Sequence, residues 1–215
     1  VKSLALAQSA DITARLGREG VSVLHGTACL KGPGQVEVTT DGGSQLVEAD
    51  VVLIATGAHP RVVAGAEPDG ERILDWRQLY DLPELPEHLV VIGSGVTGAE
   101  FANAYLAMGS RVTLVSSRDR VLPGEDRDAA ELLEGVFQRR GMQVRRGRAA
   151  GVERTAGGVV VRLTDGSTVE GSHALMTVGS VPNTGGLGLE EAGVALTDGG
   201  FIQVKNMVFK INADA

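Results

Sequence analysis

Three glycines in the middle of the chain have the spacing of a phosphate-binding loop. Gly93, Gly95 and Gly98 follow the apolar run 89–92 in the pattern G-x-G-x-x-G. The first glycine permits a sharp turn, the second lets the backbone approach a pyrophosphate, and the third allows a helix to pack closely on a strand. Free N–H groups at the helix N-terminus would then face the phosphates. This spacing favours the binding of a dinucleotide.

The pattern carries this meaning only when a strand precedes it and a helix and a second strand follow. Residues 89–92 predict a buried strand, 101–108 a helix that ends at Gly109, and 112–115 the second strand. The alternative is an ordinary glycine-rich turn between a strand and a helix. The candidate cofactor-binding residues of this loop are Gly93, Ser94, Gly95, Val96, Thr97 and Gly98.

The end of the second strand bears on the choice between NADH and NADPH. NAD-specific domains place a carboxylate there, about 20 residues after the glycines, to accept hydrogen bonds from the ribose hydroxyls. This chain has Ser116, Ser117 and Arg118 instead. Hydroxyls and a guanidinium suit a 2′-phosphate, which a carboxylate would repel. We therefore expect NADPH to be accepted; the alternative is that Arg118 and Arg120 are solvated loop charges.

Composition limits the other functions. The chain has 215 residues and a formal net charge of −7, which argues against nucleic acid and anionic membranes as partners. Cys29 is the only cysteine, so no internal disulfide and no thiolate-rich metal site can form within one chain. We expect a cytoplasmic protein with no metal site.

The chain in order predicts an α/β protein with an internal repetition. Gln35 to Gly57 and Gly158 to Gly179 share one plan, in which antiparallel strands lead to an apolar strand that ends in glycine. An internal duplication of a nucleotide-binding unit explains this. The predicted helices are 1–19, 75–79 and 125–140, and the predicted strands are 21–24, 26–30, 35–39, 45–49, 50–57, 142–146, 149–154, 158–163, 168–170 and 173–179.

Three motifs together resemble the flavoprotein pyridine nucleotide-disulfide oxidoreductase family. They are Ala55-Thr56-Gly57, the run Gly93 to Glu100, and Gly179 to Thr184 with Leu187 to Glu190 behind it. Within that family the chain is similar to the dihydrolipoamide dehydrogenase-like NAD(P)H quinone reductases of actinobacteria. The resemblance covers roughly residues 1–204. It implies a Rossmann-like parallel sheet with helices and a three-stranded antiparallel cover, flanked by remnants of a related FAD domain.

The resemblance also implies roles for single residues. Glu100 would lie near the nicotinamide, and Gly179 would line the nicotinamide pocket. Thr56 and Gly57 would contact FAD, and Thr27-Ala28 would lie beside its adenine. The alternative for Glu100 is a surface carboxylate near a helix N-terminus, and for Thr27-Ala28 it is an ordinary strand start. No catalytic residue is expected in this chain.

The domain boundaries follow from this resemblance and from a change in composition after Gly57, where Pro60, Pro68, Pro83 and Pro86 interrupt the chain. We expect a partial FAD-binding domain at 1–60, a crossover linker at 61–86, an NAD(P)-binding domain at 87–178 and a return into the FAD domain at 179–204. Residues 205–215 form an atypical tail, whose Lys, Asn, Phe and Ile content differs from that of the rest of the chain.

The implied activity is that of an FAD-dependent oxidoreductase. The complete protein would pass hydride from NAD(P)H to FAD, and electrons would then go to a disulfide or a quinone. The family's redox cysteine pair and its dimer domain match nothing here, so we expect a piece of a longer, homodimeric protein. Ser180 also stands where the family's motif usually has arginine. The alternative is a dinucleotide-binding module with no catalytic activity of its own. A thioredoxin reductase-like branch is disfavoured because the chain has no C-x-x-C.

Overall fold

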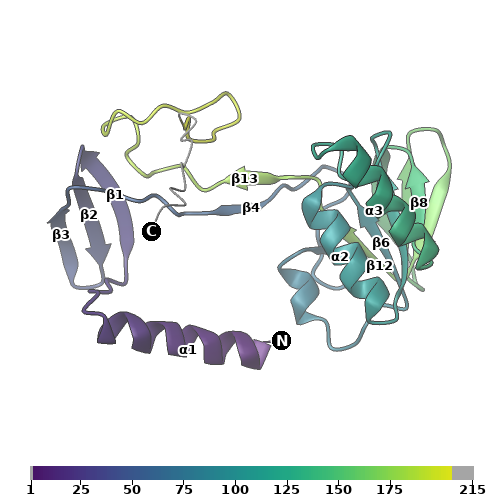
Figure 1. The fold of residues 1–215 in the computed structure, drawn as a ribbon, viewed down its shortest axis with the longest axis horizontal. Coiled ribbons are helices and arrows are strands. Elements are labelled where there is room, and N and C mark those ends of the chain that lie inside the picture. The colour runs from purple at the N-terminus through teal and green to yellow at the C-terminus, as the bar shows by residue number, and fades with distance from the viewer. Residues whose placement is uncertain (1, 205–215) are drawn as a thin grey trace, which may run out of the picture. The chain divides into compact units, whose positions relative to one another are not determined.

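The computed structural model describes residues 2–204, so the tail expected at 205–215 lies outside the described residues. The chain divides into two compact units (Figure 1). Of the described residues, 2–59 and 181–204 form unit 1, and 60–180 form unit 2. Across the described residues, no helix is long and apolar enough to cross a membrane.

Unit 2 is built on a five-stranded parallel sheet with the strand order β5-β12-β6-β7-β8. The central strands β6 and β12 are apolar runs and lie side by side, with Leu175 opposite Val91. All their residues except the partly exposed His173 are buried, which is typical of a parallel sheet covered on both sides. The strands are β5 (Ile73–Asp75), β6 (His88–Ile92), β7 (Arg111–Ser116), β8 (Gln143–Arg146) and β12 (His173–Met176).

Two layers cover this sheet. Alternate residues of β6 enter two separate hydrophobic clusters: Leu89 and Val91 pack with Tyr105 and Phe137 of the helices, and Val90 packs with residues of a second, antiparallel sheet. The helices are α2 (Val96–Ala107), α3 (Arg127–Arg139) and the short 3-10 helix η1 (Gln78–Asp81), and the antiparallel strands are β9 (Ala149–Arg154), β10 (Val159–Leu163) and β11 (Thr168–Gly171). The predicted α/β class with its three-stranded cover is confirmed.

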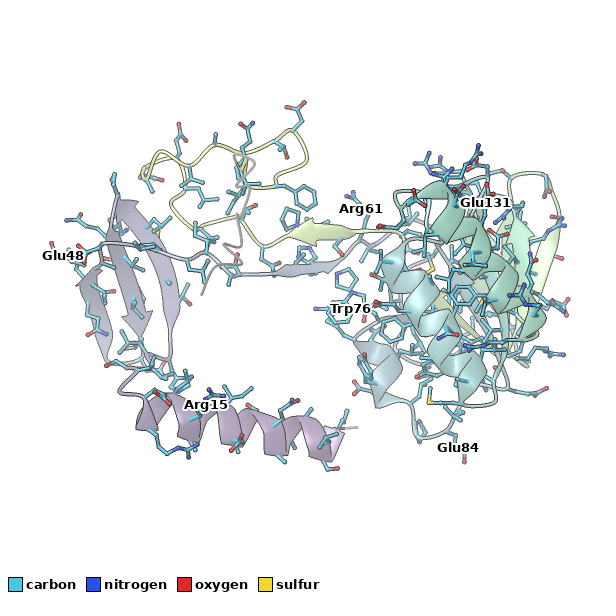
Figure 2. All side chains as sticks on the ribbon, viewed as in Figure 1. Arg15, Glu48, Arg61, Trp76, Glu84 and Glu131 are labelled. Carbon is cyan, nitrogen blue, oxygen red and sulfur yellow. The ribbon has the colours of Figure 1, made fainter. Side chains whose placement is uncertain are left out.

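Unit 1 has a helix, a three-stranded antiparallel sheet and an irregular C-terminal segment. All described side chains of α1 (Lys2–Arg18) lie at least partly in solvent (Figure 2). The sheet comprises β1 (Thr27–Gly32), β2 (Gln35–Thr40) and β3 (Gly43–Glu48). The chain passes between the units at β4 (Ala58–Pro60) and β13 (Ser180–Pro182), which pair with each other.

Two strands predicted in unit 1 are absent. Residues 21–24 and 50–57 have no strand structure, and Leu53 is 87% exposed. The prediction for 50–57 was wrong because an apolar run forms a buried strand only when neighbouring strands pair with it. The matching run in unit 2 becomes β12 because β5 and β6 flank it. Residues 50–57 have no such neighbours among the described residues.

The segment expected to be a crossover linker, 61–86, contributes structure to unit 2. It supplies β5 at the edge of the parallel sheet and η1 beside the helices. The helix expected at 75–79 is η1, which begins three residues later, because the Asp75 side chain accepts hydrogen bonds from the N–H groups of Arg77 and Gln78.

Candidate functional site

The glycine loop lies at the carboxyl end of β6, between that strand and α2. Gly93 has a φ of +115°, and a Cβ atom there would lie 2.3 Å from the Thr177 carbonyl oxygen. A Cβ atom on Gly98 would lie 1.9 Å from the Gly93 carbonyl oxygen. These distances are far below van der Waals contact, so both positions need glycine for the loop to close on itself.

Packing does not require a glycine at position 95. Its φ is −72°, and a Cβ atom there would meet no atom of the described residues within 4 Å. Gly95 is also the N-cap of α2, and no side chain in the described part of the chain caps this helix. The first N–H groups of α2 therefore have neither an intrahelical acceptor nor a capping side chain. Open space in front of free donors at a helix N-terminus fits a pyrophosphate.

A pocket of about 220 Å³ opens beside this loop. Its lining residues are Trp76, Gly95, Val96, Thr97, Thr177, Gly179 and Ser180. Thr177 holds the loop in place, because its hydroxyl donates to the carbonyl oxygens of Ile92 at 2.9 Å and Gly93 at 3.1 Å. Thus Val96, Thr97 and Gly179, all predicted, lie in one pocket with the glycine loop.

Trp76 and Thr177 are residues that the sequence reasoning missed at this site. Trp76, labelled in Figure 2, follows β5 at the carboxyl edge of the sheet. The Asp75 side chain stabilises the turn that contains Trp76, because it accepts hydrogen bonds from the N–H groups of Arg77 and Gln78. Burial alone would raise the pKa of Asp75, but hydrogen bonds from Gln78 and Arg77 outweigh it and hold the pKa below its usual value. The sequence gives only a weak signal for Trp76, since a single tryptophan is as often a packing residue as a residue that contacts a ligand.

The three residues predicted to contact a 2′-phosphate lie differently from one another. Ser116 is fully buried, and its Oγ lies 2.7 Å from Oγ of Ser94. It also accepts a hydrogen bond from the Arg118 N–H at 3.2 Å. The Ser116 hydroxyl is therefore enclosed rather than presented to solvent. Ser117 and Arg118 are exposed.

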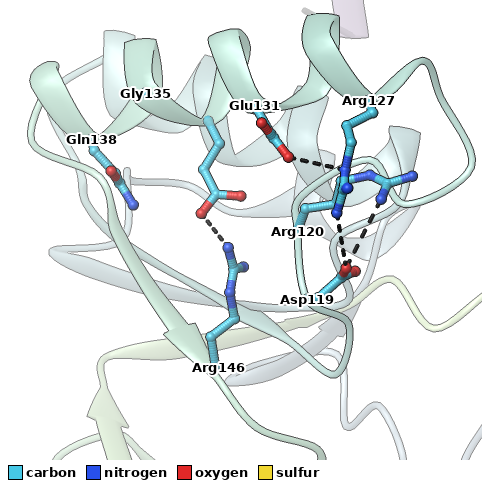
Figure 3. Close-up of a pocket in the computed structure, with 8 residues that line it drawn as sticks. Asp119, Arg120, Arg127, Glu131, Gly135, Gln138 and Arg146 are labelled. Carbon is cyan, nitrogen blue, oxygen red and sulfur yellow. Dashed lines mark hydrogen bonds and ion pairs between the residues drawn. The ribbon is translucent and has the colours of Figure 1, made fainter.

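The arginines of this region also differ in their partners. Figure 3 shows Arg120 and Arg127 converging on Asp119, at 3.9 and 4.0 Å, while Arg127 also pairs with Glu131 at 3.1 Å. They line a pocket of about 250 Å³. In the described part of the chain, no ion pair or side-chain hydrogen bond engages the Arg118 guanidinium. The guanidinium of Arg118 is thus unpaired among the described residues, whereas those of Arg120 and Arg127 have acidic partners.

Glu100 lies on the exposed face of α2, one turn after the glycine loop. Within residues 2–204 its carboxylate has no hydrogen-bond or ion-pair partner. Its position is compatible both with a place near a bound nicotinamide and with an ordinary surface carboxylate.

In unit 1 the structure brings together two motifs that are far apart in sequence. The Thr56 hydroxyl donates to the Asn183 carbonyl oxygen at 2.9 Å, and the Asn183 side-chain amide donates to the Thr56 carbonyl oxygen at 2.9 Å. The Asn183 N–H also reaches the Gly57 carbonyl oxygen at 3.0 Å. His59 Nδ1 lies 2.7 Å from Asn183 Oδ1. His59 therefore has a structural role here.

Thr27 and Ala28 begin β1 and are exposed. The same strand contacts the segment behind Asn183, because the Leu30 N–H donates to the Leu187 carbonyl oxygen at 2.8 Å. A Cβ atom on Gly188 would lie 2.0 Å from the Leu30 carbonyl oxygen. Residues 187–188 therefore dock on β1. No cluster of possible metal ligands occurs in the part of the chain that the structure describes.

Comparison with known proteins gives a consistent result. The profile of the family described as pyridine nucleotide-disulphide oxidoreductase matches residues 3–210. A protein of Mycobacterium tuberculosis named NAD(P)H dehydrogenase (quinone) is 58% identical over 212 residues, which cover 95% of this chain and 43% of that protein. A dihydrolipoyl dehydrogenase of Chlorobaculum tepidum is 36% identical over 208 residues, covering 94% of this chain and 44% of that protein. The chain thus spans less than half the length of these relatives.

Comparison with solved structures gives the same kind of relatives as the sequence comparison. The crystal structure of LpdA from Mycobacterium tuberculosis superimposes with a TM-score of 0.82 and 56% sequence identity, covering 95% of this chain and 46% of that one. The flavoprotein disulfide reductase RclA of Escherichia coli gives a TM-score of 0.70 with 26% identity, over 86% of this chain and 42% of that one.

Proposed function

Because the chain belongs to the pyridine nucleotide-disulphide oxidoreductase family, whose members are FAD-dependent enzymes that use NAD(P)H, we propose that unit 2 binds NAD(P)H at its glycine loop. In the complete protein, hydride would pass from NAD(P)H to FAD, and electrons would then go to a disulfide or a quinone. FAD and NAD(P)H supply the redox chemistry, and this chain's residues bind and orient them.

The observation that carries the proposal is the contrast between Gly95 and its neighbours. Gly93 and Gly98 are required by packing, whereas Gly95 stands before open space at an uncapped helix N-terminus. A turn that served only to join strand and helix would not need glycine at position 95. The backbone N–H groups of α2 would donate to the pyrophosphate, and Thr177 would keep the loop closed.

Arg118 favours NADPH over NADH. Its guanidinium is exposed and unpaired among the described residues, and no carboxylate occupies the end of β7. A guanidinium forms charge-assisted, bidentate hydrogen bonds with a phosphate, whereas NADH offers only ribose hydroxyls at that place. Ser117, beside it, would add a hydroxyl donor. Ser116 is buried and would contribute through its hydrogen bonds to the main chain of Arg118.

We assign unit 1 to FAD. Thr56 and Gly57 would contact it, Thr27-Ala28 would lie at its adenine, and residues 1–60 and 179–204 would be parts of one FAD domain that continues outside this chain. The NAD(P)-binding domain would cover 87–178, after the segment 61–86. Near the nicotinamide we place Gly179 and Glu100. The complete protein would act as a homodimer.

The electron acceptor is proposed from the relatives. The name of the Mycobacterium tuberculosis relative supports a quinone, and the name of the Chlorobaculum relative supports a dithiol-disulfide couple. With Cys29 as the only cysteine, this chain cannot supply a redox cysteine pair. The second candidate function is therefore a nucleotide-binding module that catalyses nothing alone. Assay of the chain with NADPH, added FAD and a soluble quinone distinguishes the two, since turnover would exclude the module.

Titration of the chain with NADPH and NADH, followed by its melting temperature, tests the binding proposal. We expect both nucleotides to raise the melting temperature, NADPH more than NADH. Arg118→Glu should remove the difference. Arg111→Glu is the matched control. Arg111 lies at the other end of β7, and its substitution changes the net charge by the same amount as Arg118→Glu. An unchanged difference in Arg118→Glu would contradict the NADPH assignment.

A further inference from the structure

The glycine loop and the loop after β7 are joined at Ser94. The Ser94 hydroxyl lies 2.7 Å from that of Ser116, and both residues are buried. The Ser94 carbonyl oxygen accepts a hydrogen bond from the Leu122 N–H at 2.8 Å. One residue of the pyrophosphate loop thus contacts both ends of the segment 116–122, through its side chain and through its main chain.

Ser116 connects Ser94 to Arg118 by hydrogen bonds. Its Oγ accepts a hydrogen bond from the Arg118 N–H at 3.2 Å and donates to the Arg118 carbonyl oxygen at 3.0 Å. Because a hydroxyl has one hydrogen and two acceptor sites, the hydrogen between the two serines then comes from Ser94. The main chain of Arg118 is therefore held on both sides by one buried hydroxyl, which is itself held by Ser94.

The far end of the segment is held under strain. Leu122 is the one non-glycine residue with a positive φ, 54°, among the described residues. A bulky side chain in this region persists only where surrounding contacts enforce it. Those contacts are the Leu122 hydrogen bond to Ser94 and the burial of Val121, whose N–H donates to Glu134 Oε2 at 2.9 Å.

We infer that Ser94 and Ser116 are positioning residues: their buried hydroxyl pair fixes the main chain of Arg118 relative to the glycine loop, and the discrimination between NADPH and NADH depends on this pair. The inference rests on the proposed function. NADPH differs from NADH only in the 2′-phosphate, and charge-assisted hydrogen bonds to it require the guanidinium at one place relative to the pyrophosphate. A loop released from Ser116 would leave Arg118 free to move away from that place.

Calorimetric titration of NADPH and NADH into the purified chain tests this inference through the ratio of the two dissociation constants. The variants are Ser116→Ala, Ser94→Ala, Arg118→Ala and the double variant Ser116→Ala/Arg118→Ala. Ser110→Ala is the matched control, because Ser110 is buried in the same unit and its hydroxyl has no hydrogen-bond partner among residues 2–204. Circular dichroism checks that each variant is folded.

We expect Ser116→Ala to reduce the preference for NADPH about 3- to 10-fold, the effect of losing hydrogen bonds of ordinary strength. Ser94→Ala should reduce it less, because Ser116 keeps its bonds to Arg118, and Ser110→Ala should leave it unchanged. Once Arg118 is alanine, the Ser116 substitution should have no further effect on the ratio. If Ser116→Ala does not fold, the Ser94→Ala result decides.

The outcomes separate this inference from the proposed function. If Arg118→Ala abolishes the preference while both serine variants keep it within twofold of the unsubstituted chain, the inference is overturned and the proposed function stands. If the preference does not depend on Arg118, the inference and the NADPH assignment both fall, while dinucleotide binding stands. If neither nucleotide binds the unsubstituted chain, the proposed function itself fails and the inference falls with it.

Discussion

Thr56 and Asn183 are 127 residues apart in the sequence and exchange two hydrogen bonds, each of 2.9 Å. One runs from the Thr56 hydroxyl to the Asn183 main chain and the other from the Asn183 side chain to the Thr56 main chain. This reciprocal pair joins the A-T-G motif to the G-S-V-P-N motif. The two motifs are therefore joined through Thr56 and Asn183, which both belong to unit 1.

Asn183→Asp should weaken this junction. The substitution keeps the side chain's size but puts a carboxylate oxygen where an amide N–H faced the Thr56 carbonyl oxygen. We expect a loss of about 1 kcal/mol in stability and faster hydrogen exchange at the amide of residue 183. Asn103→Asp is the control, because Asn103 Oδ1 accepts from Arg140 at 3.2 Å and a carboxylate preserves that bond. Equal exchange rates in the two variants would argue against the junction.

Gly98→Ala should destabilise unit 2 strongly. The new methyl group would lie 1.9 Å from the Gly93 carbonyl oxygen and 2.7 Å from Oγ1 of Thr177, so α2 must move away from β6. We expect a loss of about 3 kcal/mol or more in urea unfolding, at the upper end for overpacking. Gly124→Ala, where a Cβ atom would meet no atom of residues 2–204 within 4 Å, should be nearly neutral. Equal stability of the two variants would show that the close contact is not required.

His88 should make the stability of unit 2 depend on pH. Its Nε2 lies 2.9 Å from the Thr113 hydroxyl, and burial, with a smaller effect of Arg111, lowers its pKa below 6.5. A depressed histidine pKa means that the unfolded chain binds the proton first, so stability falls as the pH drops below about 6.5. His173 has a pKa lowered by burial and by Arg72, and acts in the same direction.

Denaturant titrations between pH 7.5 and 5 measure this effect. His88→Gln, which keeps a side-chain N–H for Thr113, should make the fall in unfolding free energy shallower without removing it, because His173 remains. Carboxylates with lowered pKa values, such as Asp69 and Asp75, lose their contribution only below about pH 4 and do not interfere. A fall that is equally steep in His88→Gln would refute the assignment.

The exposed apolar residues of unit 1 should make the isolated chain bind hydrophobic dyes and associate. Val51 is 84% exposed and Leu53 is 87% exposed, in a segment with no strand structure. Contiguous exposed apolar surface of this kind favours association. Val51→Lys/Leu53→Lys should lower dye fluorescence and the associated fraction in ultracentrifugation, with little change in stability. A monomeric chain that binds no dye would contradict this expectation.

The fold of unit 2 was predictable because its local patterns and its tertiary environment agree. The apolar runs at β6, β7 and β12 are buried in one sheet, and the glycine spacing falls at the strand-to-helix turn. Residues 50–57 carry the same pattern but form no strand. The difference lies in the neighbours of the two runs, which the pattern of one segment does not encode.

The site was predictable where backbone geometry determines the residue type. Gly93 and Gly98 follow from close approaches that glycine alone tolerates. The sequence puts Ser116 at the end of β7, but the orientation of its side chain depends on a partner 22 residues away, Ser94, which the order of residues does not reveal. Thr177 and Trp76 were not predicted for the same reason, since they follow other strands of the sheet, β12 and β5.

The proposal that the glycine loop binds a dinucleotide is tested most directly by calorimetric titration of Gly95→Ala with NADPH and NADH. The methyl group would enter open space, so the variant should stay within about 1 kcal/mol of the unsubstituted chain in stability, the usual range for an N-cap substitution. Affinity for both nucleotides should fall about tenfold or more, because the methyl group separates the N–H donors from the phosphates. Equal affinity in Gly95→Ala and in the unsubstituted chain would show that the glycine loop is a turn and not the binding site.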